Sequence, residues 1–378
     1  MSDEGKGVLR TASIDDAAAI TAFLAEIGLV MPEGPEAVAR HWHGLWVDNP
    51  ALIHHRDAGA PGWILEDGGA IKGFFGNVPL VYWLGERPVT ISCASTWAVM
   101  PEYRAETSRL CDAYFNQGNV DLLLVSSAIP PVGKRFREYG GMPMPQPDYG
   151  DILYWIIDAP GFLRAGLRKK GRSRFAAFWL ALFGSVPLDF SMRLGGRRPF
   201  AALDQITPVG IQAVDGAFDD LWQRRRRQLP ETLLASRDAA TLKWHFGLGA
   251  GSDEARVLRY DRDGVLKGYA VLVREDAPAI GLKRMKIADL FIDDDDPKVM
   301  QALLAGAYEY AMARGCHVLE LIGLSATLRA QALENKPYTR QMATFPFFYK
   351  ALTAEMTTTL ASPAAWYVTA YDGDTSLI

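Results

Sequence analysis

The chain has 378 residues, of which 49% are hydrophobic and 22% are charged, as expected for a globular protein of about two domains. The formal net charge of -4 provides no general attraction to nucleic acid. The three cysteines, Cys93, Cys111 and Cys316, are too widely spaced for a zinc site or a disulfide framework. We therefore expect no metal and a cytoplasmic location.

Neither the N-terminal residues nor the most apolar stretch of the chain indicates a membrane protein. The N-terminal residues MSDEGKGVLR include acids and no apolar run, so we expect no secretory signal. The most apolar stretch, residues 175–184, is shorter than the roughly twenty residues that cross a bilayer.

Hydrophobic periodicity and turn residues predict a mixed α/β pattern in the first half of the chain. An antiparallel meander is expected from 62 to 99, because turns such as Asp67-Gly68-Gly69 separate its apolar runs. The other expected elements are a strand at 8–11, helices at 13–28 and 35–47, a helix at 106–117, a central strand at 120–126, a helix at 132–139 and a closing strand at 152–157.

The second half predicts a similar order of elements, so we expect two structural repeats. Domains are expected at 1–160 and 205–378, joined by a basic and aromatic connector at 161–204. Elements expected in the second half are helices at 217–229 and 239–246, a hairpin at 255–274, a strand at 285–292, a helix at 297–314, a strand at 316–322, a helix at 325–333 and a last strand at 366–371.

Three segments of the first half resemble GNAT acetyltransferases. VLRTASIDDAAAITAFLAEIG, from Val8, is similar to the opening strand and helix of that family. AVMPEYRAETSRLCDAYF, from Ala98, resembles the strand, loop and helix that hold acyl-CoA, and FREYGGMP, from Phe136, resembles the end of a later helix. The resemblance implies an α/β fold of two tandem GNAT-like domains, each a mixed, mostly antiparallel sheet flanked by helices.

The whole chain also resembles tandem-GNAT proteins found near polysaccharide biosynthesis functions. The residues that carry this resemblance are Arg237-Asp238 with Leu242-Lys243-Trp244-His245, and Trp366-Tyr367-Val368-Thr369 followed by Asp372-Gly373-Asp374. It implies an amine acceptor such as an amino sugar or a polysaccharide precursor.

In the GNAT fold, a loop after the fourth strand and the following helix N-terminus bind the CoA pyrophosphate. The family pattern Q/R-x-x-G-x-G/A corresponds here to Arg104-Ala105-Glu106-Thr107-Ser108-Arg109. Thr107 still offers a hydroxyl group, and Arg109 either blocks the phosphates or binds one bidentately. The alternative is a strand-to-helix turn with a charged first helical turn. The resemblance implies acyl-CoA contacts from Val99, Tyr103, Arg104, Thr107, Ser108 and Arg109.

The equivalent loop of the second half is Asp293-Asp294-Asp295-Asp296, whose charge repels a pyrophosphate. We expect a solvated helix start there. A divalent cation is the alternative, although consecutive aspartates lack the alternate spacing of a calcium loop.

Acyl transfer to an amine needs a base for the ammonium and an acid for the leaving thiolate. The resemblance implies a tyrosine acid at the position of Phe136, which has no proton to give. Tyr139 is the nearest substitute, with a packing role as the alternative. Asp289 lies within an apolar strand, where an acid is costly unless paired, so it is a candidate for catalysis or substrate binding. Glu320 has the same interpretations, and the alternative for Asp289 is a salt bridge with Lys286, Arg284 or Arg259.

The run Arg224-Arg225-Arg226-Arg227 covers all faces of one helical turn and predicts a solvated or ion-paired surface. Together with the basic and aromatic segment 164–198, it also permits peripheral contact with a membrane or an anionic lipid-linked substrate. Contact with tRNA is a further option, although no recognised nucleic-acid module supports it.

These features together predict an acyl-CoA-dependent N-acyltransferase. Acetyl-CoA or another acyl-CoA is the expected cosubstrate, acetyl is the default acyl group, and the acceptor is a small-molecule or saccharide amine. Two alternatives remain. The altered loop and the missing tyrosine favour a binding or scaffold protein built from two decayed GNAT domains, and the arginine run permits aminoacyl transfer from tRNA.

Overall fold

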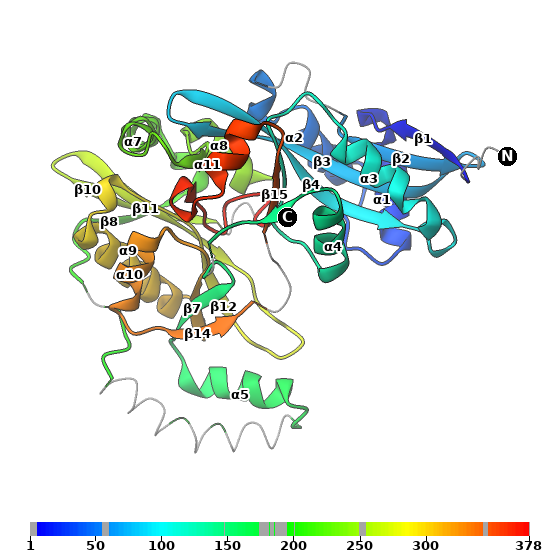
Figure 1. Cartoon of the computed structure of the whole chain (residues 1–378). Coiled ribbons are helices and arrows are strands. Elements are labelled where there is room, and N and C mark those ends of the chain that lie inside the picture. The colour runs from blue at the N-terminus through cyan, green and yellow to red at the C-terminus, as the bar shows by residue number, and fades with distance from the viewer. Residues whose placement is uncertain are drawn as a thin grey trace.

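Two β-sheets covered by helices stand side by side in the computed structural model (Figure 1). It describes residues 6–54, 60–146, 148–173, 181, 185, 195–199, 201–248, 255–342 and 347–377. Most of the predicted membrane-facing segment, residues 164–198, lies outside the described residues.

The first sheet is built mainly from the first half of the chain. Its strands β1 to β4 form an antiparallel meander, and β5 pairs parallel with β4. The order is β1-β2-β3-β4-β5-β15-β6, with the short β9–β16 pair beside β3. Its strands are β1 (Val8–Thr11), β2 (Gly62–Asp67), β3 (Ala70–Leu84), β4 (Arg87–Val99), β5 (Leu122–Val125), β6 (Met142–Pro143), β9 (Leu233–Ala235), β15 (Phe348–Ala351) and β16 (Trp366–Tyr367).

The second sheet repeats these strand directions. Strands β8, β10, β11 and β12 are antiparallel neighbours, and β13 is parallel to β12. The order is β14-β7-β13-β12-β11-β10-β8. Its strands are β7 (Asp151–Ile156), β8 (Ile206–Gly210), β10 (Arg256–Arg262), β11 (Val265–Arg274), β12 (Arg284–Ile292), β13 (Val318–Leu321) and β14 (Tyr338–Gln341).

The two halves contribute strands to each other's sheets, and the short strands β9 and β16 of the second half also join the first sheet. β7 lies between β13 and β14 of the second sheet, with Leu153 opposite Leu321. β15 lies between β5 and β6 of the first sheet, with Phe348 opposite Val125. The prediction that residues 152–157 close the first sheet is therefore wrong, because their hydrogen-bonding partners come from the other half. A single cut near residue 160 or 205 would leave both sheets incomplete.

Helices cover both faces of the first sheet, because neighbouring residues of a strand point to opposite faces. The ring of Phe74 meets that of Trp42 of α2 edge-on, whereas the ring of Phe75 stacks on that of Tyr114 of α3. The helices are α1 (Ala17–Glu26), α2 (Pro35–Trp46), α3 (Thr107–Phe115), α4 (Pro130–Glu138), α5 (Ala159–Lys169), α7 (Gly216–Gln228), α8 (Ala239–Gly247), α9 (Pro297–Ala313), α10 (Ala326–Leu333) and α11 (Ala354–Leu360). The predicted mixed α/β fold is confirmed.

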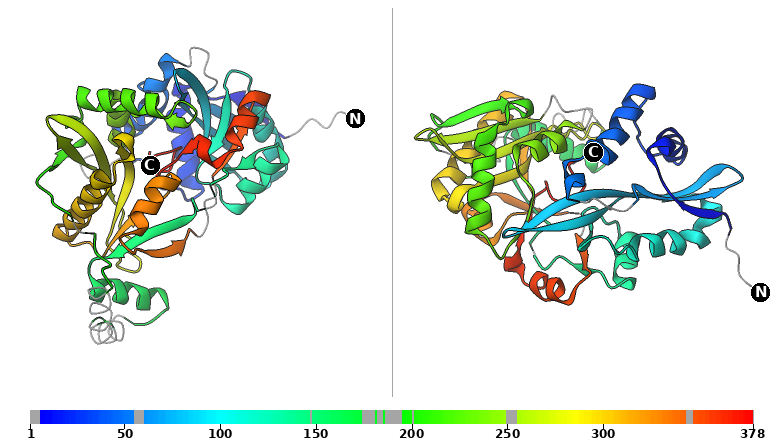
Figure 2. Two further views of the ribbon diagram at one scale, coloured as in Figure 1. Left: turned by 60° about the vertical axis from the view of Figure 1, so that its left-hand side comes forward. Right: turned by 90° about the horizontal axis from the view of Figure 1, so that it is seen from above.

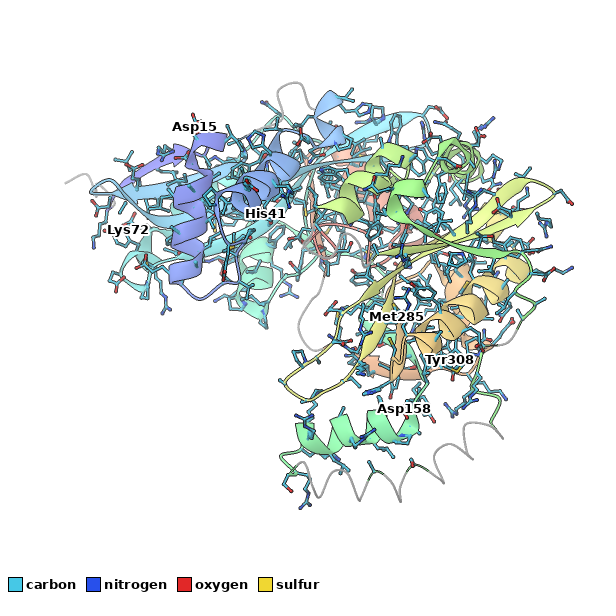
Figure 3. All side chains as sticks on the ribbon, turned by 180° about the vertical axis from the view of Figure 1, so that it is seen from behind. Asp15, His41, Lys72, Asp158, Met285 and Tyr308 are labelled. Carbon is cyan, nitrogen blue, oxygen red and sulfur yellow. The ribbon has the colours of Figure 1, made fainter. Side chains whose placement is uncertain are left out.

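Helix α5 extends away from the second sheet at the lower end of the molecule in Figure 1. It begins after Asp158, whose carboxylate accepts a hydrogen bond from the Gly161 N–H at 3.1 Å (Figure 3). Within the described ranges, no helix is long and apolar enough to cross a membrane.

Two of the four arginines on α7, Arg225 and Arg226, are buried, and Arg226 reaches across to the first half. Arg226 is 4% exposed, lies 2.9 Å from Glu86, and stacks over the ring of Trp83 at 3.8 Å. Arg225 is 1% exposed, and Arg227 is exposed. The ion-paired part of the prediction is confirmed for Arg224, Arg225 and Arg226.

The C-terminal segment, residues 366–377, runs between the two sheets, as the two views in Figure 2 show. Trp366 and Leu377, near its ends, are both buried. Its predicted strand is short: Trp366–Tyr367 pairs with β9, and Thr369 forms an isolated antiparallel bridge with Gly323. The remaining residues instead contact the middle of each sheet, which places this segment at the candidate site.

Candidate functional site

The parallel pair β4–β5 separates in the middle of the first sheet. The two strands pair only from Ile91 to Cys93, and no described strand pairs with this side of β4 from there to Val99. β4 has one residue more than β3 between Ala94 and Trp97. Such a bulge bends a strand and increases its twist, which explains why the pairing ends there. We call the opening beside residues 94–99 the first fork.

Tyr114 of α3 fills the base of the first fork. Its hydroxyl group donates to the Ser92 carbonyl at 2.8 Å and accepts from the Leu124 N–H at 3.3 Å, so it joins the two strands where they separate. Burial raises the pKa of the Tyr114 hydroxyl. Beyond it, residues 95–99 are half-buried, and their backbone groups on the β5 side are not used by a described strand.

The predicted pyrophosphate loop is a helical turn. Residues 101–106 form a 3-10 helix that continues into α3, and the Thr107 N–H donates to the Arg104 carbonyl. Arg109 points back to the N-terminal strand, where it donates to the Gly7 carbonyl at 3.1 Å and pairs with Glu106 at 3.0 Å. The Arg104 side chain is exposed and makes no hydrogen bond or ion pair with a described residue.

The other predicted cofactor residues lie at the same corner, where β4 ends and α3 begins. The Tyr103 hydroxyl group donates to Asp67 at 2.5 Å, and this hydrogen bond raises the pKa of Tyr103 to about 12. Lys6 Nζ lies 4.2 Å from the centroid of the Tyr103 ring. Ser108 is exposed on the first turn of α3, and Val99 is half-buried at the end of β4.

Tyr139 and Phe136 lie at the end of α4. Phe136 is fully buried, 4.8 Å from Phe115 between ring centroids. The Tyr139 ring stacks on Phe115 at 4.4 Å, and its hydroxyl group donates to Asp112 Oδ1 at 2.6 Å. Burial and this hydrogen bond raise the pKa of Tyr139. The phenol proton is therefore shared with Asp112, which fits the packing interpretation of Tyr139.

The second sheet has an equivalent opening, but the chain itself fills it. β12 pairs with β13 only up to Ile287, next to a bulge at Ala288. The Tyr367 hydroxyl group donates to the Leu290 carbonyl at 2.5 Å. A Cβ atom on Gly323, whose φ is +67°, would lie 2.7 Å from the Val368 carbonyl oxygen, so only glycine allows this close approach. The second opening is thus occupied by the C-terminal segment.

Asp289 belongs to a buried network that anchors this segment. Its carboxylate lies 3.0 Å from Arg237 Nε and accepts from the hydroxyl groups of Tyr269 and Thr369, both at 2.8 Å. Arg237 also pairs with Asp372 at 3.2 Å. Burial by itself lowers the pKa of the Arg237 guanidinium. The charges of Asp289 and Asp372 have the larger effect, and the pKa is raised.

The network gives Asp289 a structural partner and no exposed surface. The predicted salt bridge of Asp289 with Lys286, Arg284 or Arg259 is wrong. Lys286 and Arg284 pair with Glu275, and Arg259 pairs with Asp261. Glu320 is also ion-paired, with Arg340 at 2.9 Å and Arg284 at 3.6 Å.

The aspartate run of the second half faces arginines of α7. Asp293 pairs with Arg224 at 3.2 Å and Asp295 with Arg225 at 2.7 Å, while Asp296 accepts from the Lys298 N–H at the start of α9. The expected solvated helix start is therefore wrong for Asp293, which is 7% exposed. Among the described residues, no group of three His, Cys, Asp or Glu side chains is arranged to hold a metal.

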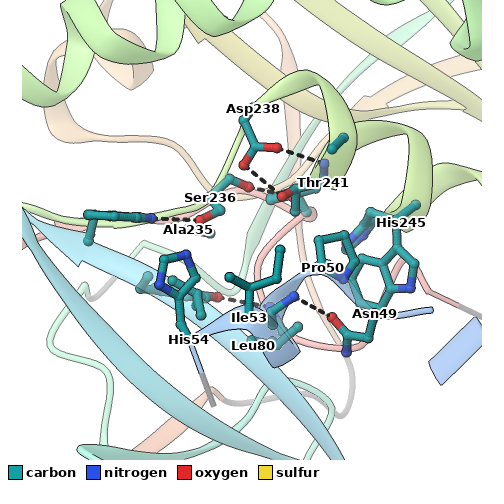
Figure 4. A pocket seen from close by; sticks show the side chains of 18 residues that line it. Asn49, Pro50, Ile53, His54, Leu80, Ala235, Ser236, Asp238, Thr241 and His245 are labelled. Atoms are coloured by element: carbon teal, nitrogen blue, oxygen red, sulfur yellow. Dashed lines mark hydrogen bonds between the residues drawn. The ribbon is translucent and has the colours of Figure 1, made fainter. Parts of the chain in front are cut away.

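A cavity of about 220 Å³ lies between the halves (Figure 4). The turn after α2, β3, β9, α8 and the C-terminal segment form its wall. Aromatic and apolar side chains dominate the lining, and Asp238 is the acidic residue in it. Asp238 also begins α8, since its carboxylate accepts from the Thr241 N–H at 2.9 Å.

His245, Tyr371 and Gly373 also line the cavity. His245 Nε2 lies 2.6 Å from Ser376 Oγ, and burial, reinforced by the charge of Arg237, lowers the pKa of His245 to about 3. A Cβ atom on Gly373 would lie 2.2 Å from the Ser126 Oγ atom just after β5. The C-terminal segment thus separates the cavity from the end of the strand that borders the first fork.

Comparison with solved structures identifies the architecture. A GCN5-related N-acetyltransferase from Anabaena variabilis matches with a TM-score of 0.57 and 12% sequence identity, over 92% of this chain and 73% of that chain. The fold is that of the GCN5-related N-acetyltransferases. A probable N-acyltransferase from Enterococcus faecalis also matches with a TM-score of 0.57, at 11% identity over 91% of this chain and 72% of that chain.

Saccharomyces cerevisiae N-myristoyltransferase, solved with bound myristoyl-CoA, matches with a TM-score of 0.53 and 11% identity, over 93% of this chain and 81% of that chain. No protein-family model matches the sequence, and no curated protein matches it in sequence. The likeness is therefore one of fold.

Proposed function

We propose that the protein is an acyl-CoA-dependent N-acyltransferase whose acyl-CoA site is the first fork. The observation that carries this proposal is the asymmetry of the two openings. Among the described residues, no strand pairs with the β5-facing side of β4 at residues 95–99, whereas Tyr367 and Thr369 occupy the second opening. The structural neighbours include transferases of this class and one solved with bound acyl-CoA, which supports the choice of cosubstrate.

In the first fork, backbone N–H and C=O groups of β4 would bind the amide groups of the CoA arm, as an added strand binds a sheet edge. Arg104 and the first turn of α3, with Ser108, would meet the phosphates. Because Arg109 already binds Gly7 and Glu106, it would contribute only after those contacts break.

The reaction joins the amine nitrogen to the acyl carbon and breaks the carbon–sulfur bond. The ammonium loses a proton before attack, and the departing CoA thiolate takes one up. Asp289 has no exposed surface, and the Tyr139 proton is shared with Asp112. We therefore propose that water carries these protons and that acetyl is the default acyl group.

Thermal unfolding with acetyl-CoA tests the proposal. At a hundred times its dissociation constant, a ligand stabilises the folded state by about 2.7 kcal/mol. We expect a rise in Tm with acetyl-CoA, a smaller rise in Arg104→Ala, and the full rise in Arg40→Ala, which removes another exposed arginine, on α2. No rise with acetyl-CoA, longer acyl-CoAs or free CoA would overturn the proposal.

Two observations favour a second function, that of a binding protein without turnover. Arg109 is engaged within the chain, and Phe136 occupies the position of the acid. In that case acyl-CoA raises Tm, but no free CoA thiol appears with any amine. Release of thiol that depends on an added amine would exclude this alternative.

A further inference from the structure

The described lining of the cavity between the halves is acidic, and this charge plays no part in the acyl-CoA site proposed at the first fork. The lining includes Asp238 and, among its described residues, no lysine or arginine. The two oxygens of Asp238 accept from the Thr241 N–H at 2.9 Å and from the Thr241 hydroxyl group at 2.7 Å. A carboxylate oxygen has room for a second donor, so Asp238 can also receive an ammonium group.

The neighbouring charged groups do not neutralise the carboxylate of Asp238. His245 is neutral above pH 5, because burial lowers its pKa to about 3. Arg226 lies outside the lining, on the ring of Trp83 at 3.8 Å, and pairs with Glu86. Arg237 is neutralised in the buried network. His54, Tyr82 and Tyr371 are the remaining titratable side chains of the described lining, and burial raises the pKa of both tyrosines, which keeps them neutral. A cation is therefore favoured over an anion.

The rest of the wall suits an apolar body. Trp83, Trp244, Tyr371, Ile53 and Pro50 line the cavity. The Trp83 and Trp244 indole N–H groups are already bonded, to Ser236 Oγ at 2.8 Å and to the Gly44 carbonyl at 2.7 Å. These rings would leave the hydroxyl groups of a sugar without partners, which is costly. Aromatic faces also attract cations. The volume, about 220 Å³, suits a ligand smaller than a drug.

We propose that this cavity binds a small primary amine with an apolar, aromatic body, its ammonium group paired with Asp238. Its role as the acyl acceptor rests on the proposed function. The position supports that role, because Gly373, which lines the cavity, lies against Ser126, just after β5.

Isothermal titration without CoA tests the binding step. The probes are 2-phenylethylamine, 3-phenylpropionate, which reverses the charge, and glucosamine, which keeps the amine but replaces the apolar body. We expect 2-phenylethylamine to bind at least tenfold more tightly than either of the other two. Equal or tighter binding of glucosamine or of 3-phenylpropionate, or no binding of 2-phenylethylamine up to its solubility, would overturn the inference.

Asp238→Asn tests the named contact. Asparagine keeps the shape and still begins a helix well, so α8 is preserved. Asp215→Asn is the matched control, because Asp215 begins α7 in the same way, accepting from the Ala217 N–H at 3.1 Å. Of these two variants, we expect only Asp238→Asn to weaken 2-phenylethylamine binding at least tenfold. Ala240→Trp should block binding, because Ala240 lines the cavity and a tryptophan there would fill part of it. Unchanged binding in Asp238→Asn would contradict the assignment.

The two proposals fail in different ways. Asp238 is not part of the first fork, so Asp238→Asn should keep the full Tm rise with acetyl-CoA. An acetyl-CoA shift without amine binding overturns only the acceptor site. Amine binding without any shift from a CoA ligand overturns only the proposed function.

Discussion

The Arg237 guanidinium and the Asp289 carboxylate lie 3.0 Å apart, and neither side chain has exposed surface. The pair joins the start of the α8 region to the bulged part of β12, and Asp372 brings the C-terminal segment to the same point at 3.2 Å. Residues distant in sequence are thus held by one cation. The wall of the cavity and the filling of the second opening both depend on it.

Replacing Arg237 should strongly destabilise the protein. Arg237→Met leaves Asp289 and Asp372 buried without their cation, and loss of one partner of a buried pair costs about 3–5 kcal/mol. Urea unfolding measures this free energy. Arg40→Met, at an exposed position, should change it by less than about 0.5 kcal/mol. A loss below about 1 kcal/mol in Arg237→Met would show that the network adds little to stability.

The neighbouring arginines Arg226 and Arg227 should behave differently although they are adjacent in sequence. Arg226 donates to the Gly85 carbonyl at 3.0 Å and pairs with Glu86, so it links α7 to the first half. We expect Arg226→Ala to lower the free energy of unfolding by about 2–4 kcal/mol. Arg227→Ala, on the exposed side, should cost less than about 0.5 kcal/mol, and equal losses in the two variants would refute the buried role of Arg226.

Local sequence features predict most of the elements but not the pairing of the sheets. Periodicity and caps place helices such as α2, α7 and α10, because these signals lie within each segment. The exchange of β7 and β15 is not visible in the sequence, since a short apolar strand fits any buried position with free edges. Strands β6, β8, β9, β14 and β15 and helix α11 were not predicted. All are short, and β9, β14 and β15 pair with strands of the other half.

The candidate site was only partly predicted, because the contacts that build it also join residues distant in sequence. The suspicion that an acid within an apolar strand needs a partner was correct for Asp289, but the partner is distant in sequence. Arg237, Thr369 and Asp372 were noticed only as parts of a motif, with no indication that they meet. The cavity at Asp238 was missed, because its wall combines five segments that only the folded chain brings together.

His245 should make the protein less stable as the pH falls. The unfolded chain binds a proton near the ordinary histidine pKa of 6.5, whereas burial lowers the pKa in the folded state to about 3. Protons therefore favour the unfolded state, and stability is lost as the pH falls from 6.5 towards 3, by up to about 1.4 kcal/mol per pH unit. We expect His245→Gln to reduce this slope in urea unfolding between pH 7 and pH 4.5.

Other titratable groups also contribute to the pH dependence of the free energy of unfolding. Burial also lowers the pKa of His41 and His317, so part of the slope should remain in His245→Gln. Lowered carboxylate pKa values, such as that of Asp16 at about 2, act below this range. The exposed variant His43→Gln should keep the whole slope. Identical slopes in His245→Gln and the wild type would mean that His245 is accessible to protons when folded.

Tyr139 should affect stability more than chemistry. Tyr139→Phe removes the 2.6 Å hydrogen bond to Asp112 and keeps the stacking on Phe115, so we expect a loss of about 1 kcal/mol in urea unfolding. A general acid contributes about 10²–10⁴-fold to a rate. Because the phenol proton is shared with Asp112 and its pKa is raised, we expect kcat for CoA thiol release to change by less than about threefold. Asp112→Asn should reproduce the stability loss, whereas a hundredfold fall in kcat in Tyr139→Phe alone would assign Tyr139 the acid role.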